Sequence, residues 1–284
     1  MNNLLFKKWN DFSGWIVFLI AAFVYGMTIE PTASFWDCPE FISCAEKLQV
    51  GHPPGAPFYM LVGNLFTQFA SEASQVSWLV NFLNALLSAG CILFLFWSIT
   101  RLVRSLIVNE EQNLSTIDVI VILGSGFVGA LAYTFSDTFW FSAVEGEVYA
   151  FSSFLTALVF WMILRWQDES DSVYGDRWII LIAYIIGLSI GVHLLNLLCI
   201  PAIVLVFYYQ KYHAISFKGV AAAIVISGLL IVFILFVYIP GIADMGGWFE
   251  LLFVNVFGLP FHTGLIVFLT LTFLVLVGAI YRFR

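Results

Sequence analysis

Three side chains that can do acid–base chemistry lie close together in one polar stretch near the start of the chain. Asp37, Glu40 and His52 fall within FWDCPEFISCAEKLQVGHPPGAPFY, and the residues on either side of this stretch are largely apolar. A partly desolvated carboxylate gains basicity, as a general base for a hydroxyl nucleophile requires. His52 can donate to a phosphate or orient a carboxylate, and Pro53 and Pro54 hold it in a stiff, extended turn.

Each of these three side chains also has a structural interpretation. Asp37 and Glu40 have the spacing of a capping box, in which the N-cap and N3 side chains bond to each other's backbone amides. A histidine in a proline-rich turn often has a packing role instead. The sequence leaves open whether the carboxylates cap a helix, catalyse or do both, and whether His52 acts on a substrate.

A second group of acids lies later in the chain. Glu145 and Glu147 flank Gly146 at the expected outer end of an apolar segment, and Tyr149 follows them. Ionisable groups at membrane depth are functional hypotheses by default, although the same groups can be hydrated at the interface. We predict that Glu145, Glu147 and Tyr149 bind substrate, and that the acids join Asp37 in an acidic cleft.

His193 and Asn196 lie inside an apolar segment, residues 178–209, that is too long for one ordinary crossing. We predict a break near Gly191 that splits this segment into two short crossings. Broken helices near a cavity often mark binding sites, so both side chains are candidates for substrate binding. An asparagine here can equally tie two helices together, and the sequence does not decide between these roles.

The composition places all of these residues in a membrane protein. Hydrophobic residues make up 62% of the 284 and charged residues 10%, whereas soluble domains carry about 25% charged residues. We therefore expect an all-α integral membrane protein, a multi-pass helical bundle in a lipid bilayer. The net charge of −7 argues against nucleic-acid binding. The sequence also lacks the P-loop, zinc-protease and nucleophile-elbow motifs.

Long apolar runs predict about eight crossings of a bilayer whose core is about 30 Å thick. The predicted crossings are residues 12–29, 76–100, 117–135, 147–164, the two halves of 178–209, 219–239 and 264–281. Pro240 should end the seventh crossing and open a polar loop that reaches Thr263. The segment 57–70 is too short to cross and should lie at the interface.

The polar stretch itself should contain an amphipathic helix at the membrane surface, over residues 37–48. Its apolar face would consist of Phe41, Ile42, Ala45 and Leu48. With the N-terminus in the cytoplasm, every lysine and arginine except Lys47 falls on the cytoplasmic side, as the positive-inside rule requires. The candidate acids and histidines then face outward. We find no internal repeat and no soluble domain in the sequence.

Four segments together resemble a known family: FWDCPEF, KLQVGHPPGAPFY, AVEGEVYAFSS and GVHLLNLL. They are similar to a bacterial multi-pass family, formerly of unknown function, that is related to a eukaryotic transmembrane O-mannosyltransferase within the GT-C glycosyltransferases. The resemblance covers roughly residues 10–210. Its most specific parts are the GHPPG turn and the WDC-x-EF segment. Pro39 departs from the family, which tends to have a small residue there.

The resemblance implies a polyprenyl-phosphate sugar as donor and an acid just after the first crossing as general base, which is Asp37 here. The turn at His52, Pro53 and Pro54 resembles a further family mark, and we predict that Pro53 and Pro54 contribute to substrate binding. Many members continue into a soluble C-terminal region. We therefore expect residues 1–284 to form a single GT-C-like transmembrane domain, either complete or the N-terminal part of a longer protein.

The leading hypothesis is a glycosyltransferase of the inner (cytoplasmic) membrane that acts on its outer face. It would move a sugar from the lipid-linked donor to a hydroxyl, on a serine or threonine of an exported protein. Asp37, Glu40 and His52 would be the catalytic residues. We assign no metal site, and leave open whether a divalent metal takes part. The alternatives are a transporter or flippase for a lipid-linked sugar and, less favoured, a noncatalytic assembly subunit.

Overall fold

The computed structural model describes residues 2–53, 55–108, 113–170, 172, 175–212 and 214–282. Within these residues the chain is helical and contains no β-strand. The chain divides into two compact units, Met1–His213 and Ala214–Arg284. All predicted site residues lie in the first unit. The predicted all-α, multi-pass class is confirmed.

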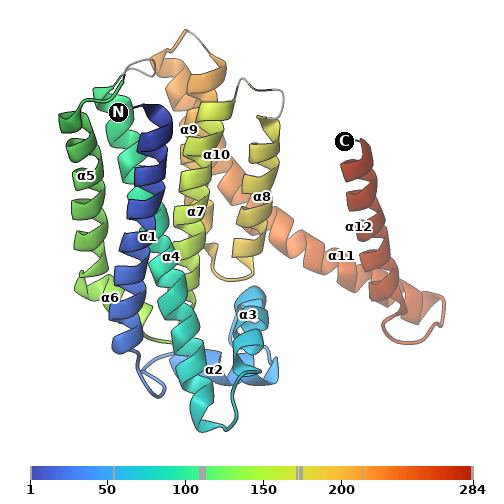
Figure 1. The fold of residues 1–284 in the computed structure, drawn as a ribbon. Coiled ribbons are helices and arrows are strands. Elements are labelled where there is room, and N and C mark those ends of the chain that lie inside the picture. Colours follow the sequence, from blue (N-terminus) through green and yellow to red (C-terminus); the bar gives the residue numbers. More distant parts are fainter. Residues whose placement is uncertain are drawn as a thin grey trace. The chain divides into compact units, whose positions relative to one another are not determined.

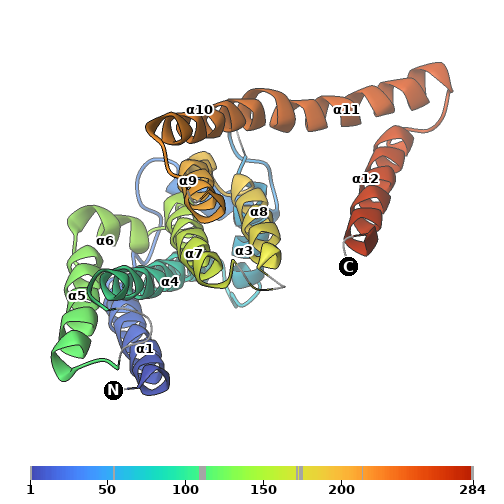
Figure 2. The same ribbon diagram turned by 90° about the horizontal axis from the view of Figure 1, so that it is seen from above.

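One long helix, α4 (Ser74–Ile107), organises the first unit. Figures 1 and 2 show it between α1 (Asn3–Met27), α5 (Thr116–Thr134) and α7 (Val148–Glu169), all of which pack against it. Small residues permit the close approach. A Cβ built on Gly126 of α5 would lie 2.7 Å from the Phe96 ring of α4. Inside a bilayer the hydrophobic effect does not drive helices together, so they associate through close packing of this kind.

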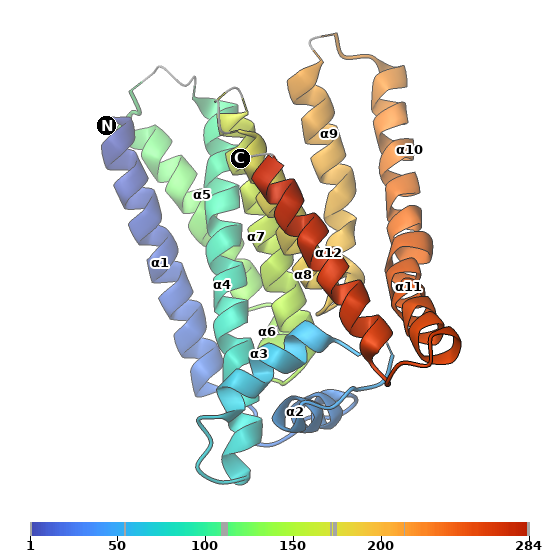
Figure 3. The same cartoon turned by 90° about the vertical axis from the view of Figure 1, so that its right-hand side faces the viewer.

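Two short helices lie at one end of this bundle (Figure 3), α2 (Cys38–Lys47) and α3 (Pro57–Thr67). They pack against each other, and Phe41, Ile42 and Ala45 of α2 are buried as predicted. Leu48 was wrongly placed on this face. It is 54% exposed because the chain turns into a left-handed conformation there, with φ 48° and ψ 45°, which ends the helix.

The predicted break in residues 178–209 is confirmed. Helix α8 (Asp176–Ile190) stops before Gly191, a 3₁₀ segment η1 (Leu194–Cys199) follows, and α9 (Ile200–Lys211) completes the segment. The backbone N–H of Phe58 donates to the Gly191 carbonyl over 2.7 Å. The broken segment is therefore tied to the start of α3.

The number of crossings differs slightly from the prediction. Within the described residues, seven helices are long and apolar enough to span a membrane. The predicted crossing without such a helix is the first half of residues 178–209, which corresponds to α8; its 15 residues fall just short of the ~17 that a span requires. The remaining short helix of the first unit, α6 (Asp137–Ala143), connects α5 to α7.

The second unit contains α10 (Phe217–Phe233), α11 (Ile239–Leu251) and α12 (Thr263–Arg282). Two expectations were wrong here. Pro240 does not end a helix, and most of the predicted polar loop after it is helical instead. A π-helical segment, η2 (Ile234–Tyr238), joins α10 to α11, and η3 (Leu252–Val256) extends the helix further. The wider π turn accommodates the ring and the missing N–H of the proline, which sits in the first turn of α11.

Candidate active site

The three side chains singled out first lie together at the α2 end of the first unit. Glu40 and His52 make two contacts: the backbone N–H of His52 donates to Oε1 of Glu40 over 2.6 Å, and ring Nδ1 lies 3.0 Å from Oε2. On the other side of the ring, Nε2 lies 3.8 Å from Oδ2 of Asp37. The imidazole therefore bridges two carboxylates that are both open to solvent, with side chains 55% exposed for Asp37 and 39% for Glu40.

The capping-box interpretation of Asp37 and Glu40 was wrong. Asp37 occupies the N-cap position of α2, but its side chain accepts no capping hydrogen bond. Its φ of −84° and ψ of −7° are helical, whereas a capping residue is normally extended. Glu40 does not reach back, because its carboxylate is engaged by His52. Asp37 is therefore not needed by the helix end and its oxygens face solvent.

A tight turn holds His52 in place. The Gly55 N–H donates to the His52 carbonyl over 2.9 Å, and Gly55 has a φ of +90°, which favours glycine. Pro53 lies within this turn, while Pro54 lies outside the described residues. A Cβ added at Gly51 would sit 3.1 Å from Oε1 of Glu40, so the chain passes close to that carboxylate. The histidine thus lies in a hydrogen-bonded tight turn, whereas the prolines predicted an extended one.

Glu40 and His52 shift each other's pKa in the direction that favours their charged forms. The hydrogen bonds from the His52 backbone and ring lower the pKa of Glu40 below its usual value. In turn, the hydrogen bond to Glu40 raises the pKa of His52, and the charges of Glu40, Asp37 and Glu147 add to this against a smaller effect of desolvation. The histidine is thus favoured as a cation that lies beside the free carboxylate of Asp37.

The second acid pair is more buried than an interfacial, hydrated pair would be. Glu145 is 7% exposed and Glu147 is 6% exposed. Burial, followed by the charges of Glu145 and Asp37, raises the pKa of Glu147 to about 7. Burial also raises the pKa of Glu145. The charges of Asp37 and His52 also act on Glu147, so the two groups of acids lie within electrostatic range of each other. The acidic cleft stays a prediction.

Two asparagines of α4 that were not predicted as site residues lie beside this acid pair, and one of them, Asn84, holds the backbone of both acids. The side-chain amide of Asn84 donates to the backbone carbonyls of Glu145, over 2.5 Å, and Glu147, over 2.7 Å. The amide of Asn81 donates to the Glu30 carbonyl over 2.6 Å. Both asparagines are fully buried. The available signal was two amides spaced i, i+3 on one face of an apolar span, which predicts a polar contact across helices.

The remaining candidates form a separate group near the broken segment. The rings of Tyr149 and His193 lie 5.4 Å apart. Nδ1 of His193 accepts the Leu195 N–H over 3.1 Å, so the histidine caps η1, and burial lowers its pKa. Asn196 is fully buried, with no hydrogen-bond partner for its amide among the described residues. In the described parts of the chain, no hydrogen bond or ion pair joins this group to His52 and its two acids.

Asp37, Glu40 and His52 also have the composition of a cation site. One ligand atom from each lies within 4.8 Å of the others. Carboxylate oxygens with an imidazole nitrogen can bind divalent transition metals. A protonated histidine cannot be a ligand, however, and the contact with Glu40 stabilises the protonated form. The group has the composition of a metal site, and the contact with Glu40 also suits an imidazolium held between two carboxylates.

Comparison with known proteins gives the family. The model of the protein O-mannosyl-transferase TMEM260 N-terminal domain matches residues 37–216. A protein O-mannosyl-transferase tmem260 of Dictyostelium discoideum is 24% identical over 148 residues, which is 52% of this chain and 16% of that protein. The Mus musculus protein O-mannosyl-transferase TMEM260 is 25% identical over 174 residues, or 61% of this chain and 22% of that protein.

The chain thus spans about a sixth to a fifth of the length of these relatives. No solved structure matches it. The family model begins at Asp37 and takes in the turn at His52, the acid pair at Glu145 and Glu147, and the broken segment. The site residues described above therefore all fall within the matched region, and the chain belongs to the family defined by the TMEM260 N-terminal domain.

Proposed function

We propose that this chain is a GT-C-type membrane glycosyltransferase that moves a sugar from a polyprenyl-phosphate donor to a serine or threonine hydroxyl of an exported protein. The observation that carries the proposal is the state of Asp37. Its carboxylate is 55% exposed, caps no helix amide and lies 3.8 Å from the ring of a histidine that is favoured as a cation. A carboxylate that caps no helix amide and is open to solvent is available to accept a proton.

Transfer at this site would be an inverting displacement. The acceptor oxygen attacks the anomeric carbon while Asp37 takes the hydroxyl proton, and the bond from that carbon to the phosphate oxygen breaks, with its electron pair leaving on the phosphate. His52 lies beside Asp37 and can neutralise the charge that develops on the leaving phosphate. General-base and electrostatic assistance of this kind each contribute factors of about 10² or more to rates.

Glu40 acts through His52 rather than on the substrate. Its two oxygens engage the backbone and the ring of the histidine, at 2.6 Å and 3.0 Å, which fixes the ring and favours its protonated form. Glu147 and Glu145 are proposed to bind hydroxyl groups of the substrates. With a pKa of about 7, Glu147 can donate as well as accept hydrogen bonds near neutral pH.

The remaining predicted binding residues have a place in the same proposal. The turn that carries Pro53 and Pro54 would hold the donor phosphate near His52. Tyr149, His193 and Asn196 would contact the substrate further along the bundle. Asn196 supports this role because its buried amide has no partner among the described residues, and a buried polar group without a partner normally has an explanation.

Mannose is the sugar that we propose, because the two relatives carry the name protein O-mannosyl-transferase. The distribution of lysines and arginines supports a cytoplasmic N-terminus and an active site on the outer face. We further propose that residues 1–284 work as one transmembrane domain. The acids gather at one helix end rather than along a pathway through the bilayer, which favours transfer over transport.

The test is incubation of the purified protein with polyprenyl-phosphate [¹⁴C]mannose and a serine- and threonine-containing peptide. We expect radioactive peptide from the lipid-linked donor, none from GDP-mannose, and none from a matched peptide in which alanine replaces serine and threonine. Proteoliposomes with donor in one leaflet separate the alternatives. Movement of the lipid-linked sugar across the bilayer without transfer would establish a flippase. Absence of both transfer and movement would favour the noncatalytic subunit.

A further inference from the structure

A large cavity opens at the end of the first unit opposite to α2 and α3. It measures about 1050 Å³ and lies between the start of α1, the end of α4, the end of α7 and the start of α8. None of the residues that line it belongs to the candidate active site. It occupies the helix ends that the charge distribution assigns to the cytoplasm.

One wall of this cavity is a continuous row of tryptophans from four helices. The ring centroids of Trp15 and Trp97 lie 6.2 Å apart, those of Trp97 and Trp161 5.9 Å, and those of Trp161 and Trp178 6.3 Å. All four rings line the cavity. Tryptophans of this kind favour the level of the lipid headgroups, where one edge is apolar and the other is wet.

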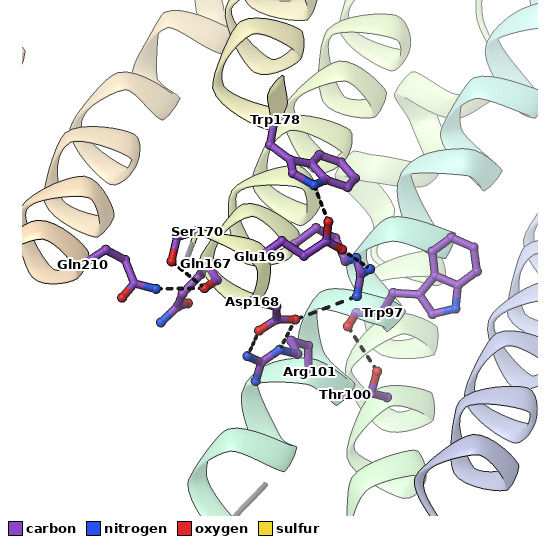
Figure 4. A network of polar contacts seen from close by, with 10 residues as sticks. Trp97, Thr100, Arg101, Gln167, Asp168, Glu169, Ser170, Trp178 and Gln210 are labelled. Carbon is purple, nitrogen blue, oxygen red and sulfur yellow. Dashed lines mark hydrogen bonds and ion pairs between the residues drawn. The ribbon is translucent and has the colours of Figure 1, made fainter. Parts of the chain in front are cut away.

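The rim of the cavity is basic. Its lining includes four basic side chains, Lys7, Arg101, Arg104 and Arg165, against the acids Asp11 and Asp168. Glu169 lies beside this lining and pairs with Arg165 over 2.8 Å, so one positive charge remains in excess. Figure 4 shows how the acids of α7 hold part of this rim. Nε of Arg101 donates to Asp168 over 3.0 Å, and the indole N–H of Trp178 donates to Glu169 over 2.9 Å.

Two of the basic groups are not neutralised by these acids. The guanidinium of Arg104 donates to the neutral side chain of Asn3 over 3.0 Å and stacks 5.2 Å from the centre of the Phe6 ring. Lys7 belongs to α1, as Asn3 and Phe6 do; it also lines the cavity and is exposed. Asp11, four residues after Lys7, also lines the cavity, so Lys7 and Arg104 together carry one positive charge in excess above the aromatic wall.

We propose that this cavity binds one anionic glycerophospholipid, with the headgroup phosphate at Lys7 and Arg104 and an acyl chain along the tryptophans. The cavity is much larger than a free phosphate, and a free phosphate would make no use of the apolar tryptophan wall. The cytoplasmic leaflet is rich in anionic lipids, which attract juxtamembrane lysines and arginines. The site is independent of the proposed glycosyl transfer, since it lies at the other end of the helices.

The test compares phosphatidylglycerol with phosphatidylcholine on the purified full chain by native mass spectrometry and thermal unfolding. We expect one retained phosphatidylglycerol and a higher Tm with that lipid. The double variant K7Q/R104Q should bind it about 30-fold more weakly, from about 1 kcal/mol for each basic group near the surface. The matched control is K8Q, which removes an exposed neighbouring charge that does not line the cavity.

Equal retention of both lipids, or an equal loss in K8Q, would overturn the proposal. Preferential binding of polyprenyl phosphate without any effect of phosphatidylglycerol would also overturn it. A second measurement does not depend on the folding of a variant: brominated phosphatidylglycerol should quench the tryptophan fluorescence of the unmodified protein more than brominated phosphatidylcholine does. Equal quenching contradicts a site that selects the anionic headgroup.

Discussion

Replacement of Glu147 by glutamine should make the protein more stable, and increasingly so as the pH rises. Glu147 is 6% exposed, and its pKa is raised to about 7 by burial and by the charges of Glu145 and Asp37. A carboxyl group whose folded pKa lies above its unfolded value binds protons more tightly in the folded state. Its ionisation therefore costs stability as the pH rises from the unfolded pKa through the folded one.

The size of this effect follows from the two pKa values. The ordinary value is 4.5 and the folded value about 7, and each unit corresponds to 1.36 kcal/mol, so the full penalty is about 3 kcal/mol. Glutamine keeps the shape of the neutral acid but cannot ionise. The variant should be more stable than the wild type by about 1 kcal/mol at pH 5 and about 3 kcal/mol at pH 8.

The assay is equilibrium unfolding in mixed micelles at a series of pH values, followed by circular dichroism. Glu46→Gln is the matched control, because Glu46 is partly exposed on α2 and surface substitutions change stability by about 0.5 kcal/mol or less. A difference between Glu147→Gln and wild type that is independent of pH, or that shrinks toward pH 8, would refute the burial of an ionising Glu147.

The other predictions concern the histidine, a possible cation and helix packing. Glu40→Gln replaces the charged acceptor that raises the pKa of His52 by a neutral one, so the alkaline limb of the transfer rate should move to lower pH; an unmoved limb contradicts the role of Glu40. The imidazolium that we propose for His52 cannot bind metal, so EDTA should leave transfer unchanged. A loss that Mn²⁺ restores would contradict the imidazolium. Gly126→Val brings a Cβ to within 2.7 Å of Phe96 and should cost about 1–3 kcal/mol, measured as a lower Tm, whereas Gly124→Val meets nothing within 4 Å and should not.

Periodicity and chain breakers predicted much of the first unit because they act locally. Phe41, Ile42 and Ala45 repeat with a helical period, and all three are buried on one face of α2. The break at Gly191 followed from a segment too long for one crossing. Its hydrogen bond from Phe58 joins residues far apart in sequence, and no local pattern reveals such a contact.

The errors arose where a distant partner or an unusual helix changed a local preference. Glu40 fits a capping box by spacing, but its carboxylate is taken by His52, twelve residues later. Pro240 normally ends a helix, but a π-helical segment before it accommodates the ring. In each case the local sequence pattern is a valid guide, but a contact with a residue far along the chain or an unusual helix geometry outweighs it.

The candidate site was partly accessible from the sequence. Asp37, Glu40 and His52 were identified from residue type and polarity, and the structure brings them together. The burial of Glu147 was not predicted, since it depends on α4, whose Asn84 binds the backbone on either side of Gly146. An ionisable group near a helix end can be hydrated or buried, and which of the two occurs depends on the tertiary packing around it.

The most direct test of the central claim is the rate of mannose transfer from polyprenyl phosphate to peptide by Asp37→Asn. Asparagine keeps the size of the side chain and suits a helix start, so the variant should fold with an unchanged Tm. The matched control is Asp137→Asn, which changes an exposed acid in the first turn of another short helix. We expect Asp37→Asn to lose a factor of about 10²–10⁴ in rate and Asp137→Asn to keep the wild-type rate. Wild-type transfer by folded Asp37→Asn would contradict its role as general base.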